Sequence, residues 1–311
     1  FATVDELRKE LLSLIHSDGP LLILGGGSNL LLTKRFDGTV LHSAIRGMEA
    51  ADCGDSVLLR CGSGECWDDV VEHAVSNGWY GAENLSIIPG DVGASAVQNI
   101  GAYGVEAKDI IHSIEALDIA TAEPRVFTAE ECNYSYRYSR FKDEWKGQYV
   151  ITHVTYRLSK TFVPHTSYGN IQAELDSRGI SVPTARDVRD VIIGIRNAKL
   201  PDPKVEGNAG SFFMNPVVDA AFYEQLAAKY PGMPHYQAGE GKVKIPAGWL
   251  IDQCGWKGRV LGKAGVHSKQ ALVLVNKGGA QGADIIALSD AVCRDVKAKF
   301  GIDIHPEVNF V

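Results

Sequence analysis

The segment from position 207 to 216 reads Gly-Asn-Ala-Gly-Ser-Phe-Phe-Met-Asn-Pro and places one hydroxyl among small residues. Small residues let the backbone turn tightly and let a ligand approach closely, so packing alone explains Ser211 poorly. The phenylalanines that follow, Phe212 and Phe213, predict that the turn is anchored in a hydrophobic core. The hydrolase pattern Gly-x-Ser-x-Gly is absent and no His follows in that context. Ser211 is therefore predicted to donate a proton and not to attack as a nucleophile.

Two further runs of small residues point to a phosphate-bearing ligand. An apolar strand at 21–24 is followed by Gly-Gly-Gly-Ser-Asn at 25–29, and the run 87–104 carries Asp91 as its one charge. Such loops can turn backbone N–H groups toward a phosphate, although a glycine turn standing alone is more often structural. A Rossmann site is disfavoured, because the Gly-x-Gly-x-x-Gly register and the later acidic residue are missing. The two runs together favour a cofactor.

Composition narrows the class of protein. The chain has 311 residues, 45% hydrophobic and 22% charged, as in an ordinary globular protein of two or three domains. No apolar run approaches the ~18 residues of a membrane-spanning helix. The net charge of −7 argues against general nucleic-acid binding, which needs a basic face. The six cysteines form no Cys-x-x-Cys pair and adjoin no His, so we expect reduced thiols in the cytoplasm and no metal site.

Hydrophobic periodicity predicts a mixed α and β chain of two domains. Residues 3–17 are predicted as an amphipathic helix capped by Thr3, and its apolar stripe comprises Leu7, Leu11, Leu12, Leu14 and Ile15. The sequence Leu-Pro-Asp-Pro at 200–203 is the main predicted boundary, since proline disfavours helix in the residue before it. The region 160–183 is mixed and rich in turns. The other predicted helices are 68–77, 187–199, 220–229 and 284–300, and the predicted strands are 21–24, 39–45, 56–61, 110–119, 125–128, 150–158, 271–275 and 302–311.

Motifs along the whole chain follow the order found in one enzyme family. They are GGGSNLL, IPGDVGASAVQNIGAYG, YSYRYSRFK, KLPDPK, GNAGSFF, AGWLIDQCGWKG and HPEVNF. Through them the chain, from about residue 3 to residue 311, resembles the UDP-N-acetylenolpyruvoylglucosamine reductases. A tyrosine loop around Tyr168 is similar to that of the type I subgroup. Relatives carry an N-terminal stretch with an Asn-Thr-Phe segment, which we expect this sequence, beginning at Phe1, to lack.

The resemblance implies an α+β fold. It comprises a two-lobed FAD-binding part of the vanillyl-alcohol oxidase type and a C-terminal α+β substrate-binding domain. The implied lobes are 1–45 and 46–200, with the tyrosine loop near 160–183. The substrate-binding domain is 201–300, and a C-terminal strand at 301–311 returns to the active site.

The resemblance also assigns a noncovalent FAD to the two glycine runs, and NADPH as the hydride donor. No His or Cys adjoins the run at 25–29, which fits a noncovalent flavin. The implied cofactor residues are Gly25, Gly26, Gly27, Ser28, Asn29, Leu30, Pro89, Gly90, Gly93, Ala94, Ser95, Gln98, Asn99, Gly101, Ala102, Tyr103 and Arg196.

The implied catalytic residues are Ser211, Arg137 and Glu307. Taken from the residues alone, Arg137 and Arg140 would be solvated charges of a turn or edge strand. A functional arginine would instead bind a carboxylate through two parallel hydrogen bonds from its guanidinium group. The family pattern selects Arg137 for this role. Strand alternation at 307–310 permits Glu307 to be an exposed carboxylate, whereas the resemblance makes it a catalytic acid. Two residues depart from the family pattern: Asn309 stands where arginine is common and Met214 where lysine is common.

Six residues are implied in substrate binding: Tyr136, Tyr168, Lys199, Asn215, Lys244 and Gln253. Each of the last five also has an ordinary structural interpretation. Tyr168 would be a surface tyrosine, Lys199 a charge at a helix C-terminus, and Asn215 the cap of a turn. Lys244 would be a solvated charge and Gln253 a polar helix residue.

The implied activity is the NADPH-dependent reduction of UDP-N-acetylglucosamine enolpyruvate to UDP-N-acetylmuramate, in the cytoplasmic synthesis of peptidoglycan precursors. We expect no nucleic acid, membrane or obligate protein partner. One alternative is a flavin-dependent oxidase of the same superfamily, which would share the glycine runs but not GNAGSFF or KLPDPK. The other is a non-catalytic nucleotide-sugar binding module, in which Ser211 and Glu307 would be structural. A turnover assay separates these possibilities.

Overall fold

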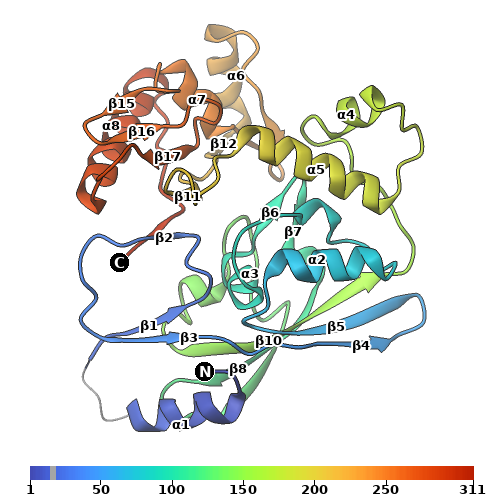
Figure 1. The fold of residues 1–311 in the computed structure, drawn as a ribbon. Helices are drawn as coiled ribbons and strands as arrows, with labels where there is room; N and C mark the ends of the chain where they lie inside the picture. Colours follow the sequence, from blue (N-terminus) through green and yellow to red (C-terminus); the bar gives the residue numbers. More distant parts are fainter. Residues whose placement is uncertain (15–18) are drawn as a thin grey trace. The chain divides into compact units, whose positions relative to one another are not determined.

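Figure 1 shows the chain as a computed structural model that describes residues 1–14 and 19–311. The chain divides into two compact units. Unit 1 comprises Phe1–Gly27 and Asp37–Arg196, and unit 2 comprises Ser28–Phe36 and Asn197–Val311. The division after Arg196 lies close to the boundary predicted at 200–203. The finer division at 1–45, 46–200, 201–300 and 301–311 stays a prediction.

Unit 1 is built on a five-stranded antiparallel sheet in the order β4-β5-β10-β8-β9. Its central strand β10 (Tyr149–Ser159) sends Val154 and Tyr156 into the core. Helix α2 (Trp67–Ser76) packs there, and the Trp67 ring lies 5.4 Å from the Tyr156 ring, edge to face. The remaining strands are β4 (Met48–Asp52), β5 (Ser56–Gly62), β8 (Ile111–Asp118) and β9 (Pro124–Thr128).

Helix α1 (Val4–Leu14) shares a small core with the parallel pair β1 (Leu21–Leu24) and β3 (Thr39–His42). Thr3 Oγ1 accepts a hydrogen bond from the Glu6 N–H at 3.1 Å, which confirms the predicted cap. Leu7 and Leu11 are buried, but Leu12 is 52% exposed, because successive helical residues point about 100° apart. The predicted stripe is thus wrong at Leu12, and its positions 15–17, including Ile15, lie outside the described residues.

Two short helices of unit 1 were not predicted. Helix α3 (Val92–Gln98) forms inside the small-residue run, because Val92 and Ala96 are buried and tertiary packing supports a poor helical sequence. Helix α4 (Ile171–Ser177) lies in the region predicted to be mixed, and packs against α5 (Ala185–Lys199). The other short elements are β6 (Gly101–Ala102), β7 (Val105–Glu106), and the 3₁₀ turns η1 (Glu83–Leu85), η2 (Ala107–Asp109) and η3 (Arg140–Lys142).

Unit 2 contains a four-stranded antiparallel sheet in the order β11-β17-β16-β15. Helices α7 (Ala247–Gln253) and α8 (Gly282–Phe300) contribute to its core, with Leu288 and Val292 fully buried. Helix α8 ends at Gly301, whose φ of 71° gives the left-handed C-cap that glycine favours. The strands are β11 (Asn208–Ser211), β15 (Val260–Leu261), β16 (Ala264–Val266) and β17 (Val273–Asn276).

A second, three-stranded sheet of unit 2 has the order β12-β14-β13 and packs with α6 (Ala220–Lys229). Its strands are β12 (Val217–Asp219), β13 (Tyr236–Gln237) and β14 (Lys242–Lys244). The C-terminal tail was predicted as one strand over 302–311. That prediction is wrong in extent, because the strand is β18 (Asn309–Phe310), which pairs in parallel with β2 (Leu30–Leu31). Upstream of it, Ile302 and Ile304 are buried in the core without joining a sheet.

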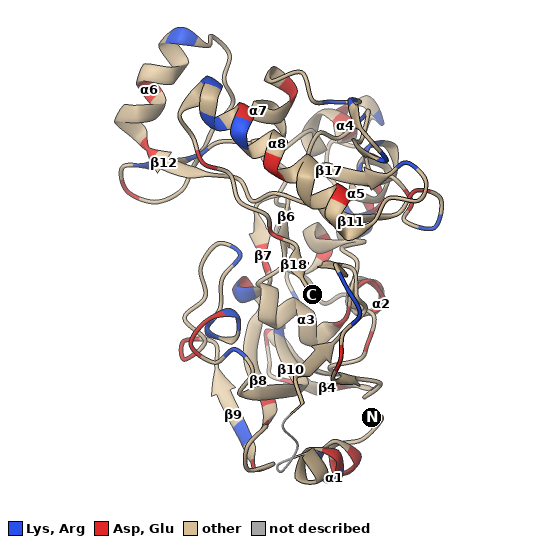
Figure 2. Cartoon of the chain, turned by 90° about the vertical axis from the view of Figure 1, so that its left-hand side faces the viewer, with Lys and Arg blue, Asp and Glu red and all other residues tan. Residues whose placement is uncertain are grey.

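Charged side chains and cysteines are distributed over both units. Figure 2 shows basic and acidic residues interspersed along the elements of both units. Among the described helices, none is long and apolar enough to cross a membrane. All six cysteines are free, and burial raises the pKa of the Cys61 and Cys132 thiols to about 12. These two thiols therefore stay protonated and act as core residues.

Candidate functional site

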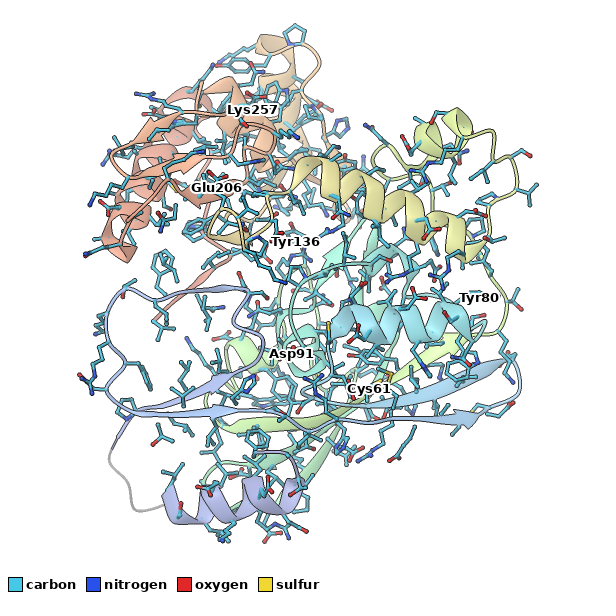
Figure 3. All side chains as sticks on the ribbon, in the orientation of Figure 1. Cys61, Tyr80, Asp91, Tyr136, Glu206 and Lys257 are labelled. Atoms are coloured by element: carbon cyan, nitrogen blue, oxygen red, sulfur yellow. The ribbon has the colours of Figure 1, made fainter. Side chains whose placement is uncertain are left out.

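The two glycine runs meet inside unit 1. A Cβ added to Gly26 would lie 3.2 Å from both Asp91 Oδ1 and Gly90 Cα, and one added to Gly25 would lie 3.5 Å from the Ala94 Cβ. A side chain at Gly26 would therefore be crowded, whereas the distance at Gly25 is an ordinary contact. Asp91, labelled in Figure 3, stands at the start of α3, and burial raises the pKa of its carboxyl group.

The first N–H groups of α3 are already paired within the protein. The Val92 N–H donates to Glu65 O and the Gly93 N–H to Ser63 O, each at 2.9 Å. Ser95 is 1% exposed, and its hydroxyl contacts Tyr156 Oη and Val92 O at 2.7 Å. The expectation that this run turns its N–H groups toward a phosphate therefore does not hold for Val92 and Gly93. Their hydrogen bonds fix the shape of the run instead.

The run begins at a strained residue. Ile87 has a φ of 49°, a left-handed conformation that β-branched residues rarely adopt and that costs about 1–3 kcal/mol. Its N–H donates to Asp68 Oδ1 at 2.6 Å, and its carbonyl accepts from Arg196 Nη2 at 3.4 Å. Two side chains distant in sequence thus hold the backbone next to Pro89 and Gly90.

The far end of the run is held by the turn that contains Arg137. Asn99 Nδ2 donates to Ser135 O at 2.7 Å, and Arg137 Nη2 donates to Gly101 O at 2.6 Å. Asn99, Tyr103 and Arg137 all have positive φ, between 45° and 55°. The Arg137 guanidinium also lies 5.3 Å above the ring of Tyr136, which is labelled in Figure 3. The segment is a turn, one of the two forms expected from the residues alone.

Arg140 has the structural role expected of it. Its Nε lies 3.1 Å from Glu144 Oε2, four residues further along the chain, and its guanidinium lies 5.4 Å above the Trp145 ring. Arg140 is therefore engaged with its own neighbourhood and takes no part in the glycine runs.

Several buried side-chain polar atoms of unit 1 have no hydrogen-bond partner within the described residues, and two of them belong to residues implied in cofactor binding. In residues 1–14 and 19–311, Gln98 Oε1 and Arg196 Nε are buried and have no hydrogen-bond partner. Burial lowers the pKa of the Arg196 guanidinium and raises the pKa of the Tyr103 hydroxyl. Buried polar atoms are normally paired, so these two fit a polar cofactor lying on the glycine runs.

The tyrosine loop packs on the end of the same run. A Cβ on Gly104 would lie 3.4 Å from the Tyr168 Cβ, and a Cβ on Gly169 would lie 3.5 Å from the Tyr103 ring. Asn84 joins the two segments, because its Nδ2 donates to Tyr103 O at 3.0 Å and to His165 O at 2.9 Å. Asn84 and Asp68 could not be found from sequence patterns, since bonds to distant backbone atoms leave no local pattern.

In unit 2, a β-bulge presents Ser211. Strand β11 pairs with β17 at Asn208 and again at Ser211, and the register shift between them includes Gly210 with a φ of 69°. Asn208 Oδ1 accepts the Gly210 N–H at 2.9 Å, which stabilises the bulge. Ser211 is exposed, while Phe212 and Phe213 are 2% and 1% exposed. The predicted aromatic anchor is therefore confirmed.

The structure brings Ser211 and Glu307 onto neighbouring backbones. The Glu307 N–H donates to Phe212 O at 2.8 Å, and Phe213 forms a β-bridge with Pro306. Asn29 Nδ2 donates to Glu307 O at 3.3 Å. The half of the first glycine motif that follows Gly27 thus belongs to unit 2, where Asn29 holds the backbone of Glu307. Asn309 Nδ2 in turn donates to Asn29 O at 3.3 Å.

The other predicted substrate residues have modest structural roles. Asn215 Oδ1 accepts the Ala247 N–H at 2.9 Å and so caps α7. Lys244 lies on β14 opposite Val217. Gln253 is exposed at the last position of α7, and Lys199 is exposed at the last position of α5. The assignment of all four to substrate binding stays a prediction.

Comparison with known proteins first defines the class. Residues 1–129 match the family of FAD binding domains, so the glycine runs of unit 1 belong to a flavoprotein. Residues 202–311 match the C-terminal domain of UDP-N-acetylenolpyruvoylglucosamine reductase. A protein of that name from Bacteroides fragilis is 56% identical over 313 residues, covering 100% of this chain and 93% of the relative. One from Porphyromonas gingivalis is 48% identical, covering 100% and 91%. The chain belongs to the UDP-N-acetylenolpyruvoylglucosamine reductase family, and it is an oxidoreductase.

A solved structure supports the fold. The crystal structure of UDP-N-acetylenolpyruvylglucosamine reductase from Thermus caldophilus aligns with a TM-score of 0.63 at 22% identity, covering 99% of this chain and 90% of that one. The expected mixed α and β fold, with an FAD-binding part followed by a C-terminal domain, is confirmed. The residues of unit 1 fit FAD, given the close approach of the glycine runs and the two unpartnered polar atoms.

Proposed function

We propose that this protein reduces UDP-N-acetylglucosamine enolpyruvate to UDP-N-acetylmuramate with electrons from NADPH, in the cytoplasmic synthesis of peptidoglycan precursors. The observation that carries the proposal is the hydrogen bond from the Glu307 N–H to the carbonyl of Phe212, the residue after Ser211, in a chain that belongs to this reductase family. A proton donor beside a carboxyl group is what reduction of an enol ether requires. The small molecule is the substrate, and no protein partner is invoked.

Noncovalent FAD supplies the hydride-transfer chemistry between NADPH and the substrate when it is bound. We assign its binding to the glycine runs, from Gly25 to Leu30 and from Pro89 to Tyr103, with Arg196 beside them. Gln98 Oε1 and Arg196 Nε would receive the partners that the protein does not give them.

Arg137 and Glu307 would stabilise the charge that develops when hydride reaches C3 of the enolpyruvyl group. Electron density then moves toward the carboxylate and forms an enolate, which preorganised donors stabilise most effectively. The guanidinium of Arg137 suits a carboxylate, and Glu307 would act as a protonated donor.

Ser211 would deliver the proton to C2 of that enolate. A hydroxyl is a weak acid, so the transfer is reasonable only toward a strongly basic carbon, and an enolate carbon is one. The small residues around Ser211 and its exposed position leave space for the substrate. Tyr136, Tyr168, Lys199, Asn215, Lys244 and Gln253 would bind the nucleotide sugar.

The absorbance of the purified protein tests this function. A flavin spectrum should be bleached by NADPH without air and restored by UDP-N-acetylglucosamine enolpyruvate, while UDP-N-acetylglucosamine alone should leave it bleached. Acid precipitation should release the flavin into the supernatant. Oxygen restoring the spectrum while the enolpyruvyl substrate does not would indicate a flavin oxidase. A bound flavin that NADPH does not bleach would contradict the proposed donor.

A further inference from the structure

The strained residue Ile87, at the start of the second glycine run, is held by a charge network around the buried Arg189 that the proposed mechanism does not use. Asp68 Oδ1 accepts the Ile87 N–H at 2.6 Å and also accepts from Arg189 Nη1 at 2.7 Å, while Asp68 Oδ2 accepts from Arg189 Nη2 at 3.0 Å. Arg189 is 4% exposed and the Asp68 side chain is 26% exposed, so the bidentate pair is partly shielded from water. The carboxylate therefore has a fixed position from which to bind the backbone of Ile87.

The network ties two helices to one point of the backbone. Asp68 lies at the start of α2 and Arg189 in the middle of α5, and Glu72 on α2 accepts from Arg189 Nε at 2.8 Å. The same helix α5 supplies Arg196, whose Nη2 donates to Ile87 O at 3.4 Å. Both polar groups of the Ile87 backbone are thus bound by side chains anchored in the α2 and α5 pair.

The backbone conformation of Ile87 determines the direction of the glycine-run residues that follow it. Ile87 is followed by Ile88, Pro89 and Gly90, and the Gly90 carbonyl accepts the Trp67 N–H at 3.0 Å. The segment is therefore fixed to α2 at both ends, at Asp68 and at Trp67. A Cβ on Gly26 would lie 3.2 Å from Gly90 Cα, so Gly90 is also a point where the two glycine runs approach each other. A change in φ at Ile87 would displace the point where the two glycine runs meet.

We propose that Asp68 is a positioning residue for FAD, which holds Ile87 in its left-handed conformation and so sets the Pro89–Gly90 backbone for the cofactor. Without this carboxylate, Ile87 relaxes to an ordinary conformation, and FAD must restore the strained one in order to bind. Glycine adopts positive φ freely, so a glycine at position 87 removes the need for the carboxylate. The inference rests on FAD being the cofactor of unit 1.

Four variants, each purified as the holoenzyme and compared with wild type, test this proposal. The measurement is the rate at which FAD fluorescence appears after dilution. Asp68→Ala should release FAD about 10- to 100-fold faster than wild type, the range expected for a lost hydrogen bond to a charged group. Asp68→Asn keeps an acceptor for the Ile87 N–H, so its release rate should stay within about threefold of wild type. Ile87→Gly alone should also stay within about threefold. The double variant Asp68→Ala/Ile87→Gly should return to the rate of Ile87→Gly.

Rescue of Asp68→Ala by Ile87→Gly shows whether Asp68 acts by holding the Ile87 backbone or only by neutralising the charge of Arg189. If Asp68 acts only as the partner of Arg189, Ile87→Gly will not rescue Asp68→Ala, and Asp68→Asn will be as impaired as Asp68→Ala. Either result overturns the proposal, as does unchanged release from Asp68→Ala. Should Asp68→Ala fail to fold, the comparison is repeated with Arg189→Met added to the two variants that carry Asp68→Ala, so that Arg189 is not left as an unpaired buried charge. A wild-type protein purified without any flavin would instead contradict the assignment of the cofactor.

Discussion

The glycine runs at 25–27 and 87–104 in unit 1, called the flavin runs below, and the segment 207–216 around Ser211 in unit 2, called the serine motif, are held in shape in different ways. Four of the six described non-glycine residues with positive φ lie in the flavin runs or in the turn bonded to them: Ile87, Asn99, Tyr103 and Arg137. Side chains distant in sequence hold these conformations, as Asp68 holds Ile87. The flavin runs thus depend on residues that are not themselves expected to touch the cofactor.

The serine motif is shaped by its own backbone. Its one left-handed residue is Gly210, where that conformation carries no steric penalty, and main-chain pairing with β17 and with Glu307 fixes the rest. Distant side chains contribute less here than in unit 1. The contrast teaches that the proposed cofactor site is built from strained backbone held by side chains, whereas the proposed proton donor is an exposed hydroxyl on an unstrained strand.

The largest effect should come from Ser211 itself. Ser211→Ala should lower turnover by about 10²–10⁴-fold, as is typical for a lost general acid, while FAD content stays at the wild-type level. Ser211→Cys should retain part of the turnover, because a thiol also donates a proton. Steady-state NADPH oxidation and the flavin absorbance of each variant provide the measurements. Loss of FAD from Ser211→Ala would contradict the separation between the two regions.

The same glycine substitution in each region should give the next largest effect. A Cβ on Gly101 would lie 2.8 Å from Arg137 Nη1 and 2.9 Å from Val105 O, so Gly101→Ala forces the run to shift. Overpacking of about 1–3 kcal/mol corresponds to roughly 5- to 150-fold weaker FAD retention. Gly207→Ala, with a nearest contact of 3.6 Å to the Asn276 Cβ, is the matched control and should retain FAD. Equal retention by the two variants would remove the contrast.

Tyr168 should affect substrate binding more than hydride transfer. Its loop packs on Gly104, and loops of this kind commonly close over a substrate. Tyr168→Phe keeps the ring and removes the hydroxyl, so the KM for the enolpyruvyl substrate should rise roughly tenfold. The rate at which NADPH reduces the flavin should stay nearly unchanged. A comparable loss in both half-reactions would place Tyr168 in the chemistry.

The smallest effect should be a pH dependence of the free energy of unfolding, caused by Glu72, which accepts a hydrogen bond from Arg189. Hydrogen bonds from Arg186 lower the pKa of the Glu72 carboxyl from 4.5 to about 2. Because the pKa is lower in the folded state, this stabilisation is present above about pH 4.5 and is lost as the pH falls toward about 2. Glu72 is 45% exposed, so Glu72→Gln should cost about 0.2–1 kcal/mol at neutral pH.

Urea unfolding at several pH values measures this effect. The difference between wild type and Glu72→Gln should shrink as the pH falls below 4.5, and it should also shrink in high salt. Glu240→Gln, a change at an exposed position of unit 2, serves as the control. A difference between wild type and Glu72→Gln that stays constant from pH 7 to pH 2 would contradict the cited shift.

Long periodic segments were predictable from the sequence. The helix predicted at 220–229 is observed as α6 (Ala220–Lys229), and α2, α5 and α8 begin within two residues of their predicted starts. An apolar face repeated over several turns determines such elements whatever their surroundings. The anchoring of Phe212 and Phe213 followed for the same reason.

Elements that depend on tertiary contacts were not predictable. Helix α3 has seven residues, too few to be stable alone, and forms because Val92 and Ala96 are buried. The tail before Asn309 forms an isolated β-bridge between Pro306 and Phe213 and is not extended into a longer strand. At the candidate site, the family motifs located the runs and Ser211, whereas Asp68 and Asn84 act through backbone bonds to residues 19 positions away. No periodicity reveals such a bond.

Double-mixing stopped-flow absorbance of the flavin tests most directly whether the two regions serve separate half-reactions. Ser211→Ala, mixed first with NADPH and then with UDP-N-acetylglucosamine enolpyruvate, should show flavin reduction at the wild-type rate. Flavin reoxidation should then be slower by at least about 10²-fold, because the proton for C2 comes from Ser211. If reduction by NADPH is slow and reoxidation by the substrate is intact, Ser211 belongs to the other half-reaction and the account is wrong.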